Sequence, residues 1–265
     1  MTRGGKSNPA GKPDTDTAPP PVSADVGIVA AMSVEVGYLI DRLTRVRKYG
    51  GPSHTVVEGE HDGKLIAVLV GGPGRAAAAQ AAALLVGGHK PRWVVSAGFA
   101  GALDPTLKRN DVVMPREIVG PDGLRFDIDV HINGEPPAKG PKLITGRLVT
   151  VDAIVRTAAE KSELRARSGA DVVDMETSAV AALCGERSVR FLSVRVVSDE
   201  AGEDLPREVV ALMNRSGGYL LGSALRAIWD RPSSLKDFLA LHNHAQEAAD
   251  RLADVTLAAI GRLPA

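Results

Sequence analysis

Two apolar runs that flank a helical segment constrain the fold more than any other feature of the chain. The first run, residues 172–173, meets the carboxylates of Asp174 and Glu176. The second run, residues 191–197, ends at Asp199. The order strand, helix, strand predicts a βαβ unit, which requires two parallel strands.

Glu176 and Asp199 follow the carboxyl ends of these two predicted strands. Ligands of open α/β sheets bind beyond such ends, so the two carboxylates mark a candidate site. A second interpretation treats Glu176 as a solvated side chain in the first turn of a helix, and Asp199 as a helix cap, which is a common place for aspartate. The spacing alone leaves both interpretations open.

The chain length of 265 residues suits one large α/β domain with an extensive core. Residues 1–24 contain five prolines together with Gly, Ser, Thr and Asp, and they lack the apolar centre of a signal peptide. We therefore expect residues 1–24 to form a disordered tail and residues 25–265 to form the domain, in a cytoplasmic protein.

The charge balance argues against several classes of partner. Lys and Arg number 32, as do Asp and Glu, so no net field attracts nucleic acid or a membrane surface. No apolar run reaches the length of a membrane span. The single cysteine, Cys184, lies among apolar residues and is expected in the core. Because no spaced cluster of Cys, His and Asp occurs, we expect neither a metal nor a cofactor.

Buried strands alternate with helices through the first half of the chain. Residues 25–31 predict a strand, and the helix that follows places Glu35 near that strand's carboxyl end. Residues 55–70 predict a hairpin with its turn at residues 62–63. Glycines at residues 71–74 then lead into an alanine-rich helix.

The next buried strand is expected at residues 93–97, followed by a Gly-rich segment. Gly, Pro and Asp dominate residues 120–142, which predict a long loop of the kind that often acts as a lid or an interface element. The remaining predicted elements are a strand at residues 143–152 and helices at 156–168, 208–214, 218–230 and from 232–234 to about 260.

The motifs at residues 173–176 (Val-Asp-Met-Glu) and 194–199 (Val-Arg-Val-Val-Ser-Asp) resemble those of the nucleoside phosphorylase/nucleosidase superfamily. They are most similar to the methylthioadenosine/S-adenosylhomocysteine nucleosidases and related adenosyl-releasing hydrolases. Residues 31–35 match the family's first-strand motif at Glu35, although Ser and Val stand where acidic residues are frequent. The resemblance implies a single-domain, three-layer α/β fold with a central mixed sheet flanked by helices. It also implies hydrolysis of the N-glycosidic bond of an adenine nucleoside.

The resemblance assigns the chemistry to two carboxylates. Asp199, oriented by Ser198, would protonate the leaving purine, which calls for a poorly solvated pocket. Glu35 would hold the attacking water, with Arg195 as a partner of the water or of the carboxylate. Arg195 interrupts the apolar pattern of its strand, so a structural salt bridge is the alternative for this residue.

The resemblance also assigns residues to the substrate. Glu176 would accept hydrogen bonds from the two ribose hydroxyls, and Met175 would pack on the sugar. Ala100 and Gly101 belong to the Gly-rich segment beside the ribose and the nucleophile. Ile154 stands where the family places an aromatic residue that stacks on the purine, so the identity of the substrate depends on this position.

Water is favoured over phosphate as the nucleophile. Phosphorolytic relatives hold phosphate with arginines and a serine, whereas here the corresponding segment carries Ser96 and Phe99, and no arginine lies within residues 27–41. Phe99 also departs from the nucleosidases, which place a small residue there.

Four alternatives stay open on these grounds. They are a phosphate-dependent purine or uridine phosphorylase, an adenosylhopanoid-type hydrolase, a futalosine-type hydrolase and a non-catalytic nucleoside sensor. The sequence leaves the 5′-substituent of the nucleoside undetermined. In the resembled family the region of residues 120–142 reaches the partner subunit's site, so we expect a homodimer.

Overall fold

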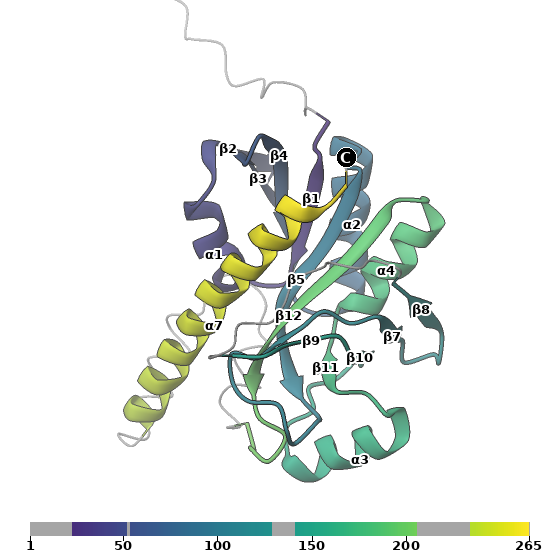
Figure 1. Cartoon of the computed structure of the whole chain (residues 1–265), viewed down its shortest axis with the longest axis vertical. Coiled ribbons are helices and arrows are strands. Elements are labelled where there is room, and N and C mark those ends of the chain that lie inside the picture. Colours follow the sequence, from purple (N-terminus) through teal and green to yellow (C-terminus); the bar gives the residue numbers. More distant parts are fainter. Residues whose placement is uncertain (1–22, 52–53, 129–140, 206–233, 265) are drawn as a thin grey trace, which may run out of the picture.

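The computed structural model describes residues 23–51, 54–128, 141–205 and 234–264. Within them, helices cover both faces of a mixed twelve-stranded sheet (Figure 1). The strands are β1 (Val26–Ala30), β2 (Thr44–Gly51), β3 (His54–His61), β4 (Lys64–Val70), β5 (Trp93–Ala102), β6 (Val112–Val113), β7 (Glu117–Val119), β8 (Arg125–Asp127), β9 (Leu143–Ile144), β10 (Arg147–Thr150), β11 (Val172–Asp174) and β12 (Arg190–Asp199). The helices are α1 (Ser33–Asp41), α2 (Arg75–His89), α3 (Ala158–Ser168), α4 (Thr177–Glu186) and α7 (Ser234–Arg262).

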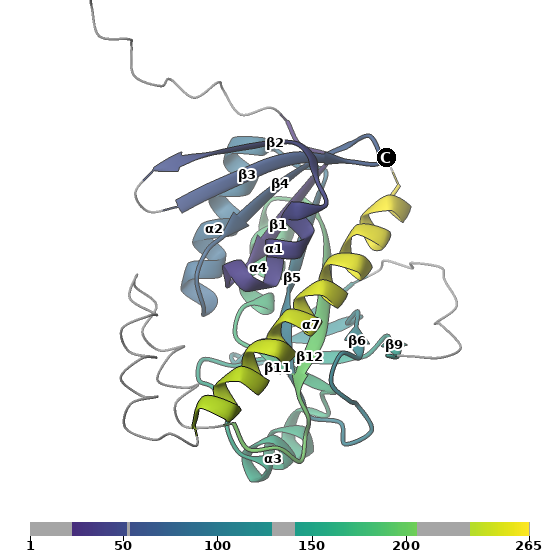
Figure 2. The same ribbon diagram turned by 90° about the vertical axis from the view of Figure 1, so that its left-hand side faces the viewer.

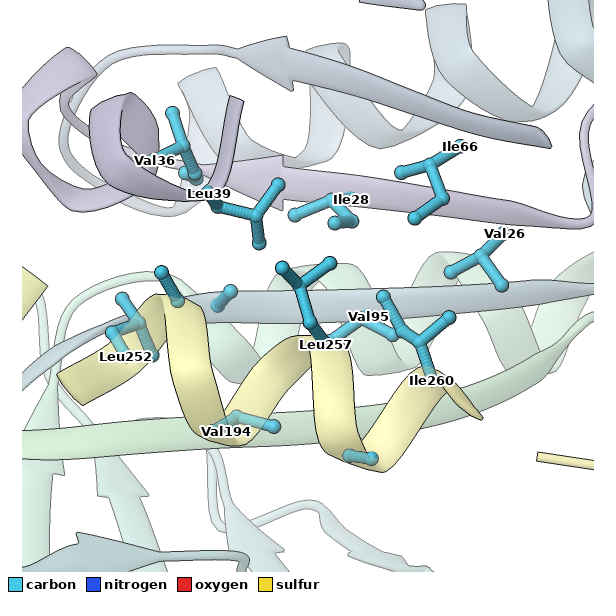
Figure 3. Packing of buried hydrophobic residues seen from close by; sticks show 14 of the residues in the cluster. Val26, Ile28, Val36, Leu39, Ile66, Val95, Val194, Leu252, Leu257 and Ile260 are labelled. Atoms are coloured by element: carbon cyan, nitrogen blue, oxygen red, sulfur yellow. The ribbon is translucent and has the colours of Figure 1, made fainter. Parts of the chain in front are cut away.

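The predicted three-layer α/β fold is confirmed. Helices α1 and α7 pack together on one face of the sheet, and α2 and α4 pack on the other (Figure 1). On the first face, Leu252 and Leu257 of α7 lie against Ile28, Val95 and Val194 of the central strands (Figure 3). On the second face, Cys184 is buried among alanines of α2, as expected for a core cysteine.

The parallel strands β4, β1, β5 and β12 form the centre of the sheet, with β2 and β3 added at the edge beside β4. The predicted hairpin is confirmed: β3 and β4 are antiparallel, and Asp62 and Gly63 form the turn with φ of 48° and 74°. Positive φ at both central positions gives a turn whose twist matches that of the flanking strands.

The predicted βαβ unit is wrong in one respect. The order strand, helix, strand holds for β11, α4 and β12. However, β11 is antiparallel to β5 and β12 is parallel to it, so β11 and β12 run in opposite directions. β5 continues five residues past the predicted end at residue 97, and this extension lies between β11 and β12 and pairs with β11 in the antiparallel sense.

The extension of β5 brings two predicted site segments together. Gly101 of β5 pairs with Val173 of β11 on one side and with Asp199 of β12 on the other. A Cβ atom at Gly101 would lie 3.1 Å from Oδ2 of Asp199 and 3.3 Å from Cγ1 of Val173. Glycine therefore allows both neighbours to approach the strand at this point.

Other boundaries differ from the prediction. The segment at residues 143–152 forms two short strands, β9 and β10, and the predicted loop at 120–142 contains β8. Residues 129–140 of that loop and the helices predicted at 208–214 and 218–230 lie outside the described residues. So do residues 1–22 of the predicted tail, whereas Ala24 is buried and its N–H donates to the carbonyl of His89.

Helix α7 crosses the face of the sheet diagonally, and α3 lies near the carboxyl ends of β5 and β12 (Figure 2). In the part of the chain that the structure describes, no helix combines the length and the apolar composition that a membrane crossing requires.

Candidate active site

A cavity of about 630 Å³ opens at the carboxyl ends of β1, β5 and β12 and beside β11. The three predicted carboxylates, Glu35, Glu176 and Asp199, all line it. Of the other predicted site residues, Met175, Ser198, Ala100, Gly101 and Ile154 line it as well. The fold thus collects residues that are up to 164 positions apart in the sequence, from Glu35 to Asp199.

Glu35 is held rigidly by backbone donors. The N–H groups of Ala31 and Met32 donate to Oε2 at 2.9 and 2.8 Å, and the N–H of Phe99 donates to Oε1 at 3.0 Å. Burial raises the pKa of Glu35 above its ordinary value, although these donors and the charge of Arg195 oppose the shift. A carboxylate with a raised pKa is suited to accept a proton near neutral pH.

Gly98 of β5 makes room for this arrangement. A Cβ atom at this position would lie 2.7 Å from Oε1 of Glu35 and 3.0 Å from Nη1 of Arg195. Both contacts are closer than real Cβ atoms comfortably allow, and neither neighbour is free to retreat because both are buried. The Gly-rich segment therefore serves the packing of charged side chains against the strand.

Arg195 is bound by side chains of three neighbouring elements, β5, β11 and α4. It does not line the cavity, and its guanidinium lies behind the wall, where Nη2 donates to Asp174 Oδ2 at 2.9 Å, Ser96 Oγ at 2.7 Å and Thr177 Oγ1 at 2.6 Å. Arg195 and Asp174 are both buried, so they form an internal ion pair. These contacts favour the structural salt bridge that was the alternative for Arg195, and its charge also acts on Glu35, so the role expected for it at the attacking water stays a prediction.

Glu176 lies at the N-terminus of α4 and accepts hydrogen bonds from two backbone groups. The N–H of Gly74 donates to Oε1 at 2.6 Å, and the N–H of Met175 donates to Oε2 at 3.2 Å. Burial raises the pKa of Glu176 to about 7, and the negative charge of Asp174 adds to the effect. The glycines before α2, noted in the sequence, thus approach the side chain of Glu176.

Asp199 is the last residue of β12, and each of its carboxyl oxygens has a partner. Ser198 Oγ donates to Oδ1 at 2.6 Å, consistent with the orienting role expected for Ser198. The ammonium of Lys161 lies 2.6 Å from Oδ2. Lys161, on α3, is completely buried, and sequence reasoning missed it. Its spacing of three residues from the buried Leu164 was the available signal, since i and i+3 share a helix face.

Arg109 and His244 also line the cavity, and neither of them was expected there from the sequence. Arg109 lines it and donates to the carbonyl of Ser198 and, at 2.6 Å, to the carboxylate of Glu203. His244, on α7, lines the cavity as well. Among the described residues, no three side chains of His, Cys, Asp or Glu are grouped as a metal site requires.

The internal ion pair can be tested by its effect on stability. Arg195→Met leaves Asp174 as an uncompensated buried charge, and the free energy of unfolding should fall by about 3–5 kcal/mol in urea titrations. Adding Asp174→Asn should recover part of that loss. Arg45→Met, which removes an exposed pair with Glu60, is the control and should change little. An Arg195→Met protein as stable as the wild type would contradict the structural role.

Comparison with known proteins places this site in a family. The sequence model of the phosphorylase superfamily matches residues 25–260. A 5′-methylthioadenosine/S-adenosylhomocysteine nucleosidase of Colwellia psychrerythraea is 27% identical over 208 residues, which cover 68% of this chain and 85% of the relative.

Solved structures agree on the fold. The Colwellia nucleosidase in complex with adenine has a TM-score of 0.70 at 23% identity, covering 91% of this chain and 96% of the other. The S-adenosylhomocysteine nucleosidase of Streptococcus pyogenes has a TM-score of 0.69 at 20% identity, with coverages of 92% and 98%. The futalosine hydrolase of Helicobacter pylori has a TM-score of 0.65 at 18% identity, with coverages of 92% and 99%. Because the family match spans nearly the whole described domain, the chain belongs to the phosphorylase superfamily.

Proposed function

We propose that the protein hydrolyses the N-glycosidic bond of a 5′-substituted adenine nucleoside and releases adenine. The observation that carries the proposal is the convergence of Glu35, Glu176 and Asp199 in one cavity with largely apolar walls. The similarity to nucleosidases over most of the chain supports the same reaction class.

The reaction makes two demands that these carboxylates meet. Water must attack C1′ of the ribose and lose a proton, and Glu35, with its raised pKa, is the base for that step. The purine must gain a proton as it leaves, and Asp199 is the carboxyl group for that step. Glu176 accepts hydrogen bonds from the ribose hydroxyls and holds C1′ between the other two groups.

The surroundings favour water over phosphate. Arg109 is the only Arg or Lys side chain that lines the cavity in the described part of the chain, and the Ser198 carbonyl and Glu203 occupy it. The hydroxyl of Ser96 is taken by Arg195 behind the wall. Phe99 fills the remaining phosphate position with an apolar ring that lines the cavity. Phosphate binding needs cations or clustered hydrogen-bond donors. In this cavity the candidate donors are already bound to carboxylates and carbonyls of the protein, or to Arg195.

The apolar walls define the rest of the substrate. Val151, Ile154 and Val155 line one side, so an aliphatic surface takes the place of the aromatic residue that stacks on the base in the family. Val34 and Leu205 line the cavity as well, so it is suited to a 5′-substituent with apolar character. The same walls suit methylthio, homocysteinyl and larger apolar groups, which a substrate panel distinguishes.

Product analysis tests the proposed reaction. We expect adenine and the free 5′-substituted ribose from at least one adenosyl compound in phosphate-free buffer, detected by mass spectrometry. Glu35→Gln should lower kcat by at least about 10²-fold while nucleoside binding persists, because a water-activating base contributes little to ground-state binding. Glu60→Gln, on β3 and outside the cavity lining, is the matched control. A sugar 1-phosphate product would identify a phosphorylase, and binding without turnover would identify a sensor.

Binding of the ribose diol should depend on pH through Glu176. Its pKa of about 7 lies above the ordinary value, so below pH 7 the free protein holds a proton there that the diol contacts displace. Affinity for a non-hydrolysable C-nucleoside should therefore rise up to about tenfold per pH unit between about pH 5 and 7, and level off above. Calorimetry in two buffers measures the released proton. Glu176→Gln should abolish this proton release. A wild-type affinity that does not depend on pH would contradict the role of Glu176 in binding the diol.

We further propose that residues 25–265 form a single catalytic domain that acts as a homodimer. Val34 and Tyr38 lie one turn apart on α1 and are both exposed, and Val34 borders the cavity, so an apolar surface lies beside the site. Light scattering should give twice the chain mass at micromolar concentration, and Tyr38→Asp should shift the protein toward monomer. A fully active wild-type monomer would refute the dimer.

A further inference from the structure

Lys161 is the one completely buried lysine among the described residues, and its ammonium touches the carboxylate of Asp199. Nζ donates to the carbonyls of Glu200 and Glu203 at 2.7 and 2.9 Å and lies 2.6 Å from Oδ2 of Asp199. Three oxygens thus surround an ammonium that water does not reach. A buried charge of this kind requires a charged partner, and Asp199 is the partner nearest to hand.

The neighbouring acidic groups have other partners. On the loop after β12, the Glu200 carboxylate pairs with Lys108 at 2.7 Å and the Glu203 carboxylate pairs with Arg109 at 2.6 Å. Asp204 accepts a hydrogen bond from the N–H of Ala158 at 2.8 Å.

The acidic groups on the other elements around the Lys161–Asp199 pair also have basic partners. Asp174 of β11 pairs with Arg195 of β12, and Arg165 of α3 pairs with Asp104. Asp199 is therefore the carboxylate left to balance Lys161 among the described residues.

This contact raises a question about the proposed chemistry. Ser198 donates a hydrogen bond to Oδ1 of Asp199, and the Lys161 ammonium makes an ionic contact of 2.6 Å with Oδ2 that lacks hydrogen-bond geometry. A carboxylate of Asp199 that pairs with an ammonium has no proton of its own to give to a leaving purine. The Lys161–Asp199 pair as a whole nevertheless holds one transferable proton, on Nζ.

We propose that Lys161 is a positioning residue that supplies, through Asp199, the proton that the leaving base receives; this inference rests on the proposed nucleosidase function. A bound nucleoside fills the cavity and excludes water, which disfavours the ion pair relative to the neutral amine and carboxylic acid. The proton then moves from Nζ to the carboxyl group of Asp199. Lys161 itself does not line the cavity and touches no substrate.

The proton balance closes over one turnover. As the C1′–N9 bond breaks, its electron pair enters the purine, and Asp199 gives its proton to the purine ring nitrogen N7. The water oxygen forms the new bond to C1′ and gives a proton to Glu35. Afterwards the Lys161–Asp199 pair takes one proton from solvent and Glu35 releases one, so the protein returns to its starting state.

The decisive variant is Lys161→Met, which keeps the length of the side chain and removes its proton. Without Lys161, Asp199 can be protonated only from solvent. The kcat on an adenine nucleoside should lie within a few fold of the wild type at about pH 5 and fall by about tenfold per pH unit toward pH 8. The kcat on a nitrophenyl riboside, whose leaving group needs no proton, should change by less than about threefold at every pH.

Two further variants separate proton supply from charge and from structure. Lys161→Arg keeps the positive charge, but guanidinium does not release a proton, so it should show the same alkaline loss. Lys108→Met removes an ammonium that pairs with Glu200 of the loop after β12, without touching Asp199 or the cavity, and it should behave like the wild type on both substrates. Melting temperatures recorded alongside show which variants fold.

The outcomes are distinguishable. If Lys161→Met lowers kcat equally on both substrates at all pH values, Lys161 only holds the loop after β12 in place. Restoration of wild-type kcat at about pH 8 by Lys161→Arg would show that charge alone is required. Either result overturns the inference and leaves the proposed function intact. A wild-type protein that releases no adenine from any adenosyl compound refutes the proposed function, and the inference with it.

Discussion

The buried ion pair between Arg195 and Asp174 is the interaction on which the rest of the site depends. It joins the ends of β11 and β12, two strands that run in opposite directions on either side of β5. Thr177 of α4 and Ser96 of β5 complete the contacts of the guanidinium. Buried pairs of this kind contribute little net stability, but they tolerate few alternative geometries. Glu176 lies two residues after Asp174 and Asp199 lies four residues after Arg195, so the pair ties together the strand ends that carry these two carboxylates.

Burial then divides these carboxylates by their partners. Glu35 and Glu176 accept hydrogen bonds from backbone donors, and burial raises the pKa of both, although the charge of Arg195 opposes the shift. Asp199 has a buried ammonium beside it. Groups of one chemical type thus acquire different tasks from their surroundings, which is how a single fold performs acid and base chemistry at one pH.

Much of the fold and the site could be predicted from the sequence, because the relevant signals are local. The apolar runs, the Asp62-Gly63 turn and the short motifs around Glu35, Glu176 and Asp199 each depend on neighbouring residues. The opposite directions of β11 and β12 could not be predicted, because they depend on pairing with a strand about 70 positions earlier. For Arg195 the interrupted apolar pattern indicated a salt bridge but not its partner. The role of Lys161 was hidden, since the burial of its charged side chain follows from three-dimensional packing.

The glycines at positions 98 and 101 of β5 have a wider consequence. The carboxylates press against bare backbone there, and β5 is hydrogen-bonded to neighbours on both edges. Amide hydrogens in such a strand exchange with solvent only when the whole domain opens. We therefore expect the amide hydrogens in the floor of the cavity to exchange more slowly than those of the walls, which come from loops and helix ends. A substitution in the walls would therefore change which nucleoside fits, whereas a side chain at either glycine would displace the carboxylates themselves.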